Sequence, residues 1–124
     1  MPVINIRSLP VAVDKPAALR ELSAELAESS GIGIEYFMIS WEFVGHDSYA
    51  CGGVVASEAD APEFPVLVTM LVADLLSVAT RQTLLEAAGQ AIARLAGVHG
   101  DKVFITCQAA ESGSVYDEGR VVEW

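Results

Sequence analysis

The residues with the most distinctive chemical potential are the first three of the chain, Met1, Pro2 and Val3. Removal of Met1 would leave Pro2 as a secondary amine at the start of a short apolar segment. A free α-amino group titrates between about 7.7 and 8.0, and burial in an apolar pocket disfavours its charged form. An N-terminal Pro2 is therefore a candidate general base at neutral pH. If Met1 is kept, the nitrogen of Pro2 is an amide and has no such role.

No other group of residues has the spacing of a known catalytic or metal site. His46 and His99 lie in glycine-containing turns, and neither has a partner at metal-ligand spacing. Cys51 and Cys107 are far apart and form no CxxC pair, so we read both as small packed residues. We expect no metal and no cofactor.

The elements that position Pro2 follow a strand, helix, strand order. They are expected at residues 3–7, 16–29 and 36–44. The helix carries leucines at positions 19, 22 and 26, with Asp14 as its cap and Gly31 just beyond its end. Phe37, Ile39 and Trp41 alternate with more polar neighbours, as in a strand with one apolar face.

The second half repeats this order. We expect a strand at residues 65–73, a helix at 78–96, a strand at 102–109 and a short ending at 121–124. Phe37 aligns with Phe104 and Tyr49 with Tyr116, which favours an internal duplication with pseudo-repeats at about residues 1–56 and 64–124. Two such units merge into one α+β domain, residues 1–124, with a four-stranded mixed sheet and both helices on one face.

The composition predicts an oligomer. Hydrophobic residues make up 52% of the chain and the mean hydropathy is +0.42, which is high for a small monomer. The sheet face away from the helices should carry Tyr36, Met38, Phe104 and Thr106, which is too apolar a set to leave in water. We expect this face to be buried against other subunits, with the start of the first strand near a subunit boundary.

The net charge excludes several classes of partner. Seventeen acidic and seven basic residues give a formal charge of −10, which disfavours nucleic acids and anionic membrane surfaces. The sequence shows neither a bilayer-spanning apolar stretch nor a signal peptide. We therefore expect a cytoplasmic protein with a small-molecule partner.

Three segments resemble the tautomerase superfamily, in particular macrophage migration inhibitory factor and the 4-oxalocrotonate tautomerases. The segment Asp101–Thr106 with Ser114–Tyr116, and the segment Gly31–Phe37, are similar to the inhibitory factor family. The segment Tyr49–Gly53 resembles a hairpin of the 4-oxalocrotonate tautomerases. The resemblance runs through nearly the whole chain.

The resemblance implies a trimer, or a hexamer of shorter chains, in which Pro2 moves a proton between carbon and oxygen of an enol–keto pair. It places Tyr36 at the position of a pocket tyrosine and Val72 at that of a backbone-contacting aliphatic residue. Phe104 stands where a tyrosine is usual, and Thr106 where an asparagine is usual. These four are the expected substrate-binding residues, and the substrate is a carbonyl or enol compound.

The sequence departs from the family at the residues that bind substrate acid groups. Ile32 stands in place of a lysine, and Met38 and Leu76 stand where related enzymes have arginines. An anionic 2-keto acid would lack its charged clamp. Candidate replacement cations, more typical of surface residues, are Arg7, Arg81, Lys102 and Arg120.

Two alternatives to an enzyme remain at this point. The first is a catalytically inactive trimer of the same fold that acts as a binding or scaffold protein. It is suggested by the absence of the family's cations and by the presence of Met1 before Pro2. The second is a ferredoxin-like ligand-sensing domain, which shares the order of strands and helices. That alternative predicts an exposed open sheet face or a dimer through it.

Overall fold

The computed structural model describes residues 1–60 and 62–124. Its centre is a mixed four-stranded sheet in the order β2-β1-β5-β6. The strands are β1 (Val3–Ser8), β2 (Met38–Phe43), β5 (Val66–Ala73) and β6 (Val103–Ala110). β1 pairs in parallel with β2, β5 pairs in parallel with β6, and β1 and β5 are antiparallel.

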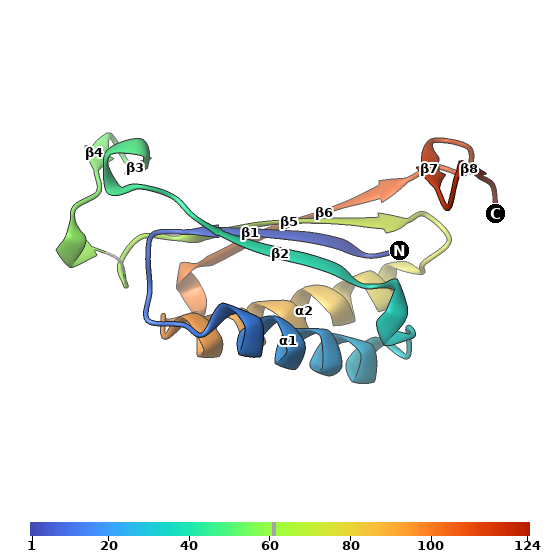
Figure 1. Ribbon diagram of the computed structural model, residues 1–124, viewed down its shortest axis with the longest axis horizontal. Coiled ribbons are helices and arrows are strands. Elements are labelled where there is room, and N and C mark those ends of the chain that lie inside the picture. Colours follow the sequence, from blue (N-terminus) through green and yellow to red (C-terminus); the bar gives the residue numbers. More distant parts are fainter. Residues whose placement is uncertain (61) are drawn as a thin grey trace.

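Two helices, α1 (Lys15–Ser30) and α2 (Val78–Ala96), cover one face of the sheet (Figure 1). Asp14 caps α1 by accepting a 3.2 Å hydrogen bond from the amide of Ala17. Ser77 caps α2 through the amide of Thr80. Gly31 and Gly97 end the helices with φ angles of 74° and 69°, in the left-handed region that glycine adopts without strain.

The core lies between the sheet and the two helices. Alternate residues of the central strands point into it, which is why β5 is buried at every second position. Its fully buried side chains include Ile4, Ile6, Leu22, Leu26, Met70, Val72, Leu84 and Ile92. Trp41 joins this core, and its indole Nε1 donates a 3.0 Å hydrogen bond to the hydroxyl of the buried Ser8.

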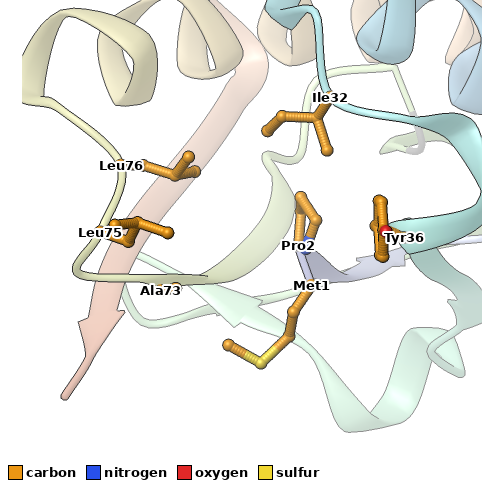
Figure 2. A pocket seen from close by; sticks show the side chains of 7 residues that line it. All are labelled: Met1, Pro2, Ile32, Tyr36, Ala73, Leu75 and Leu76. Carbon is orange, nitrogen blue, oxygen red and sulfur yellow. The ribbon is translucent and has the colours of Figure 1, made fainter. Parts of the chain in front are cut away.

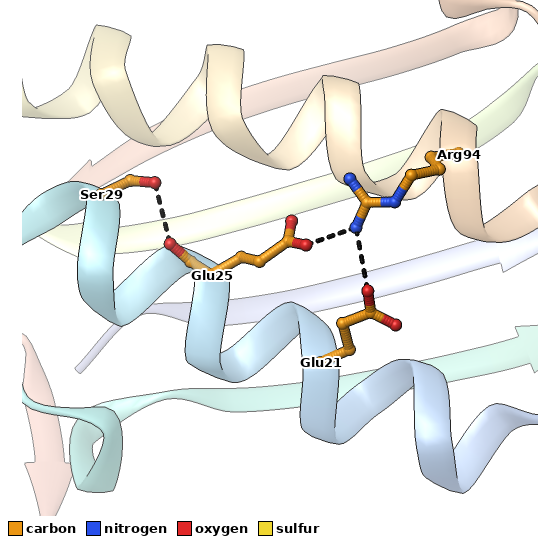
Figure 3. Close-up of polar contacts among 4 residues, drawn as sticks. All are labelled: Glu21, Glu25, Ser29 and Arg94. Carbon is orange, nitrogen blue, oxygen red and sulfur yellow. Dashed lines mark hydrogen bonds and ion pairs between the residues drawn. The ribbon is translucent and has the colours of Figure 1, made fainter.

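An ion-pair cluster ties the two helices together on their outer side (Figure 3). Arg94 of α2 donates hydrogen bonds to Glu21, at 3.3 Å, and to Glu25 of α1. Because all three side chains are at least one third exposed, the pairs contribute little to the stability of the domain.

Two small hairpins lie at opposite ends of the sheet (Figure 1). They are β3 (Ala50–Cys51) with β4 (Val54–Val55), and β7 (Val115–Asp117) with β8 (Arg120–Val122). Single 3₁₀ turns lie at Ile34–Tyr36, His46–Ser48, Glu58–Asp60 and Gly100–Lys102. The chain begins at the β7–β8 end, so both termini lie near the same end of the sheet (Figure 1). In the part of the chain that the structure describes, no helix has the length and hydropathy to cross a bilayer.

The structure confirms the predicted α+β class, the four-stranded mixed sheet and the placement of both helices. It excludes the ferredoxin-like alternative, because a split β-α-β unit separates strands that here, as β1 and β2, pair directly. Two local expectations are wrong. Tyr36 lies in a 3₁₀ turn before β2, closed by a 3.0 Å hydrogen bond from its amide to the carbonyl of Gly33. Cys51 is exposed in the β3–β4 hairpin.

The face of the sheet away from the helices has large apolar side chains in solvent. Met38 is 50% exposed, Leu67 40% and Phe104 59%. Thr106 is also exposed on this face. We call the exposed side chains of this face, including Asn5, Arg7, Met38, Leu67, Thr69, Phe104 and Thr106, the open face.

Candidate active site

Pro2 lies where the chain enters the centre of the sheet. Its ring is fully buried, and its carbonyl oxygen accepts a 3.0 Å hydrogen bond from the amide of Met38. The next residue, Val3, pairs with Met38 on one side and with Leu71 on the other. The backbone on both sides therefore fixes the position of Pro2.

A cavity of about 210 Å³ opens beside Pro2 (Figure 2). Its lining residues are Met1, Pro2, Ile32, Tyr36, Ala73, Leu75 and Leu76. They come from the chain start, the segment after α1, the last residue of β5 and the turn between β5 and α2. In Figure 2, Ile32 lies above Pro2 and Tyr36 to its right, and the leucines lie to the left across the cavity. We call this cavity the Pro2 pocket, and its wall is apolar apart from the hydroxyl of Tyr36 and backbone groups.

A second cavity, of about 590 Å³, adjoins the chain start on the side of the β7–β8 hairpin. Its lining residues are Met1, Glu35, Tyr36, Met38, Asp117, Glu118, Arg120 and Val122. We call this cavity the acidic vestibule. Met1 and Tyr36 line both cavities. The two cavities therefore adjoin each other at these two residues.

The environment of the terminal amine already shows two opposing electrostatic effects. Partial burial lowers the pKa of the Met1 amine below its usual range, because desolvation penalises the ammonium form. The Asp117 carboxylate raises that pKa, with the smaller effect of the two. Pro2 is more deeply buried than Met1, so desolvation would act on its nitrogen as well once that nitrogen is free.

The structure brings Pro2 and Tyr36 together, but it places the other predicted site residues elsewhere. The side chain of Val72 is fully buried in the core, which leaves only its backbone as a contact, and Ala73 lines the Pro2 pocket instead. Phe104 and Thr106 lie on the open face. In the sheet register Phe104 is level with Leu67, whereas Gln108 is level with Leu71 and thus with Val3.

Phe104 is therefore about 13 Å along the sheet from the level of Val3, at about 3.3 Å per residue. With Asn5, Arg7, Leu67, Val68, Thr69 and Thr106 it lines a separate shallow cavity of about 260 Å³. Within one chain, Phe104 and Thr106 do not reach the Pro2 pocket.

The three positions without the family's cations lie at these cavities. Ile32 and Leu76 line the Pro2 pocket, and Met38 lines the acidic vestibule. Of the candidate replacements, Arg120 lines the vestibule and Arg7 lies on the open face beside Phe104.

The other two candidate cations lie away from the Pro2 pocket. The ammonium of Lys102 is 4.0 Å from the carboxylate of Glu63. Arg81 lies near Cys107: burial raises the pKa of that thiol, and the charge of Arg81 partly offsets this effect. Neither residue lines the pocket or the vestibule.

Sequence reasoning missed the contribution of the β7–β8 hairpin. Asp117 and Glu118 are not among the residues predicted for the site, yet they line the cavity next to Met1 together with Arg120, a candidate replacement cation. The turn glycines Gly113 and Gly119 mark the hairpin in the sequence. Nothing in the local sequence indicates that the hairpin folds back toward the chain start.

No protein-family profile and no curated protein matches the sequence. Solved structures do match over nearly the full length. The chain is 17% identical to a fused 4-OT (4-oxalocrotonate tautomerase) described as a symmetric trimer, with a TM-score of 0.81, covering 97% of this chain and 94% of that one. The chain is 11% identical to Pt0534 inactivated by 2-oxo-3-pentynoate, with a TM-score of 0.83, covering 97% of this chain and 94% of that one.

A third match is macrophage migration inhibitory factor from Toxoplasma gondii, at 20% identity and a TM-score of 0.66, covering 95% of this chain and 97% of that one. Identities this low establish the arrangement of the backbone and not the chemistry. Together with the direct pairing of β1 with β2 and of β5 with β6, these matches identify the architecture. The chain has the fold of the tautomerase superfamily.

Proposed function

We propose that the chain, once Met1 is removed, is a tautomerase-type isomerase that uses the nitrogen of Pro2 as its acid and base. The supporting observation is the position of Pro2, which lies fully buried and held by the Met38 hydrogen bond at the wall of a 210 Å³ apolar pocket. Such a pocket disfavours the ammonium form and leaves a free amine able to accept a proton near neutral pH.

The proposed reaction needs no co-reactant. The neutral Pro2 nitrogen accepts the hydroxyl proton of an enol while the carbon–oxygen bond gains double-bond character. The same nitrogen then returns a proton to the enol carbon, so that the ketone and the neutral amine are formed. Atoms and electrons balance within the substrate, and the pocket's contribution is to hold the enol beside one nitrogen.

We propose that a homotrimer completes the site. The open face exposes Met38, Leu67 and Phe104, an apolar set that a neighbouring subunit would cover. Tyr36 and the backbone of Val72 would come from one subunit. Phe104 and Thr106 would come from the next, because within one chain they lie too far along the sheet. The symmetric trimer formed by the fused 4-OT supports this proposal.

The direct test compares Pro2-terminated protein, verified by intact mass, with the Pro2→Ala variant. The substrates are phenylenolpyruvate, 2-hydroxymuconate and the methyl ester of phenylenolpyruvate, followed by the loss of enol absorbance. We expect at least one to be ketonised above the buffer rate, and a loss of about 10²-fold or more in the variant. Equal rates for the two proteins would refute a role for Pro2.

A second candidate function is a non-catalytic binding or scaffold trimer. It is favoured by the apolar Ile32 and Leu76, which stand in the Pro2 pocket where related enzymes have cations. Retention of Met1 would also favour it. Intact mass of the protein from its native source separates the two functions. Complete retention of Met1 would exclude Pro2 as an amine catalyst and leave the binding function.

A further inference from the structure

We propose that the Pro2 pocket selects neutral apolar enol or carbonyl compounds and discriminates against carboxylate-bearing ones. This inference rests on the proposed function for its identification of the site, but the selectivity can also be measured by binding alone. Two separate features of the structure carry it: the apolar wall of the pocket and the charge of the cavity that adjoins it.

Apart from the hydroxyl of Tyr36 and the Pro2 nitrogen itself, which is neutral when it acts as a base, the pocket lining has no group that would compensate a carboxylate. Leu75 and Leu76 lie across the cavity from Pro2, Ile32 lies beside it, and none of the seven lining residues has a charged side chain. A carboxylate that enters this space loses water without gaining an ion pair, which is strongly unfavourable. A methyl ester or an alkyl ketone of the same shape loses far less hydration and buries its carbon atoms against the leucines.

The cavity that adjoins the pocket is acidic. Glu35, Asp117 and Glu118 line the vestibule with Arg120 as the single basic residue, a balance of three negative charges to one positive. Arg120 is the register partner of Asp117 in the β7–β8 hairpin, so the one cation sits beside a carboxylate. The whole chain adds a formal charge of −10. The local and global fields both oppose the entry of an anion.

A neighbouring subunit offers one route by which this selectivity would fail. Arg7 lies on the open face in the same cavity as Phe104 and Thr106. If a neighbour brings Phe104 to the Pro2 pocket, Arg7 follows along the same face. Arg7 in β1 pairs with Leu67 in β5, and Leu67 pairs with Phe104 in β6. Arg7 therefore lies two strands away from Phe104. We infer that Arg7 stays outside the pocket, and the Arg7→Gln variant tests this directly.

The first experiment compares an acid with its methyl ester on mass-verified, Pro2-terminated protein. We expect kcat/KM for the methyl ester of phenylenolpyruvate to exceed that for the acid by about tenfold or more, after correction for the uncatalysed rates. In parallel, ligand-observed NMR measures the binding of 3-phenylpropanoate and its methyl ester, and we expect the ester to bind more tightly. Equal or stronger binding and turnover of the acids would overturn the proposal.

Failure of the proposed function gives a different pattern. In that case wild type and Pro2→Ala ketonise neither substrate above buffer, while the NMR comparison still decides the selectivity. An ester preference in binding without turnover would keep the selectivity and reject the catalysis. Turnover of the acid that is lost in Arg7→Gln would keep the catalysis and reject the selectivity.

Variants separate the two sources of selectivity. Ile32→Lys introduces a cation into the pocket and should improve kcat/KM or binding for the acid by about tenfold, whereas Ile32→Met adds length without charge and should not. The double variant Glu35→Gln with Glu118→Gln should raise kcat/KM or the affinity for the acid about threefold at low salt and less at high salt. Glu86→Gln, on the exposed side of α2, removes one charge far from the site and is the control.

Thermal melts accompany each variant. If Ile32→Lys does not fold, the vestibule variants still test the proposal, because Glu35 and Glu118 are exposed and their neutralisation leaves the core intact. An unchanged acid-to-ester ratio in every folded variant would show that neither the wall nor the vestibule sets the selectivity.

Discussion

The backbone amide of Met38 donates a 3.0 Å hydrogen bond to the carbonyl oxygen of Pro2. This bond joins the start of β1 to the start of β2 one residue before their regular pairing begins. The nitrogen of Pro2 is therefore positioned by sheet hydrogen bonding and by its closed ring, with no side-chain torsion left to order. A catalyst built this way gains precision from a central strand that is paired on both sides.

Asp117 should tune the pH at which Pro2 becomes active. Its negative charge raises the pKa of the Met1 amine. We expect the same effect on the Pro2 amine that replaces it, so removal of the charge should lower the pKa of Pro2. A general base must be deprotonated, and the rate therefore rises as the pH rises through this pKa. In Asp117→Asn the rising limb of kcat/KM should move to lower pH. A pH–rate profile on the neutral ester checks this, and a shift to higher pH would contradict the assignment.

The open face should hold the oligomer together. Leu67→Glu places a charge in the middle of this face and should convert the expected trimer to monomer, with little change in the circular dichroism of the helices. Val78→Glu makes the same kind of change at an exposed apolar residue of α2 and is the control. Sedimentation equilibrium measures the masses. A monomeric wild type, or a Leu67→Glu protein that stays trimeric, would contradict the proposed interface.

Active sites shared between subunits predict complementation. Pro2→Ala lacks the base, and Phe104→Ala lacks the residue expected from the neighbour. Unfolded together and refolded as mixed trimers, the two variants should regain activity, because some sites combine an intact Pro2 with an intact Phe104. The rate of the mixture is compared with that of each variant refolded alone. A mixture no more active than the average of its parts would indicate that each site lies within one chain.

The hydrogen bond between Trp41 and Ser8 should contribute measurably to stability. Ser8 is 1% exposed and Trp41 5%, so Ser8→Ala would leave the indole N–H buried without this partner. We expect a loss of about 1–3 kcal/mol in the free energy of unfolding, measured in urea. Ser40→Ala removes an exposed hydrogen bond to the side chain of Asn5 and should cost less than about 0.5 kcal/mol. Equal losses in the two variants would contradict the argument from burial.

Features with local causes could be predicted from the sequence. The expected helix at residues 78–96 agrees with α2, because leucine spacing, a serine cap and a closing glycine all act within a few residues. The Asp14 cap of α1 is confirmed for the same reason. The four strands agree to within two residues, since their period-two alternation reflects burial on one face.

Features that depend on contacts between distant segments could not be predicted in this way. The alternation of β5 places Val72 in the core, but only the antiparallel pairing of β5 with β1, which sets Leu71 opposite Val3, brings Ala73 to the pocket beside Pro2. Asp117 reaches the chain start through the fold of a hairpin far away in sequence. The roles of Tyr36, Val72, Phe104 and Thr106 in binding, and the duplication behind the two halves, stay predictions.

The central claim is that a free Pro2 nitrogen performs proton transfer. One measurement tests it most directly: the rate of enol ketonisation by Pro2-terminated protein, set against the same protein with Met1 retained, each verified by intact mass. We predict activity in the Pro2-terminated form and the buffer rate in the form with Met1, whose residue-2 nitrogen is an amide. Equal activity in the two forms would contradict the claim, because the reaction would then proceed without the amine.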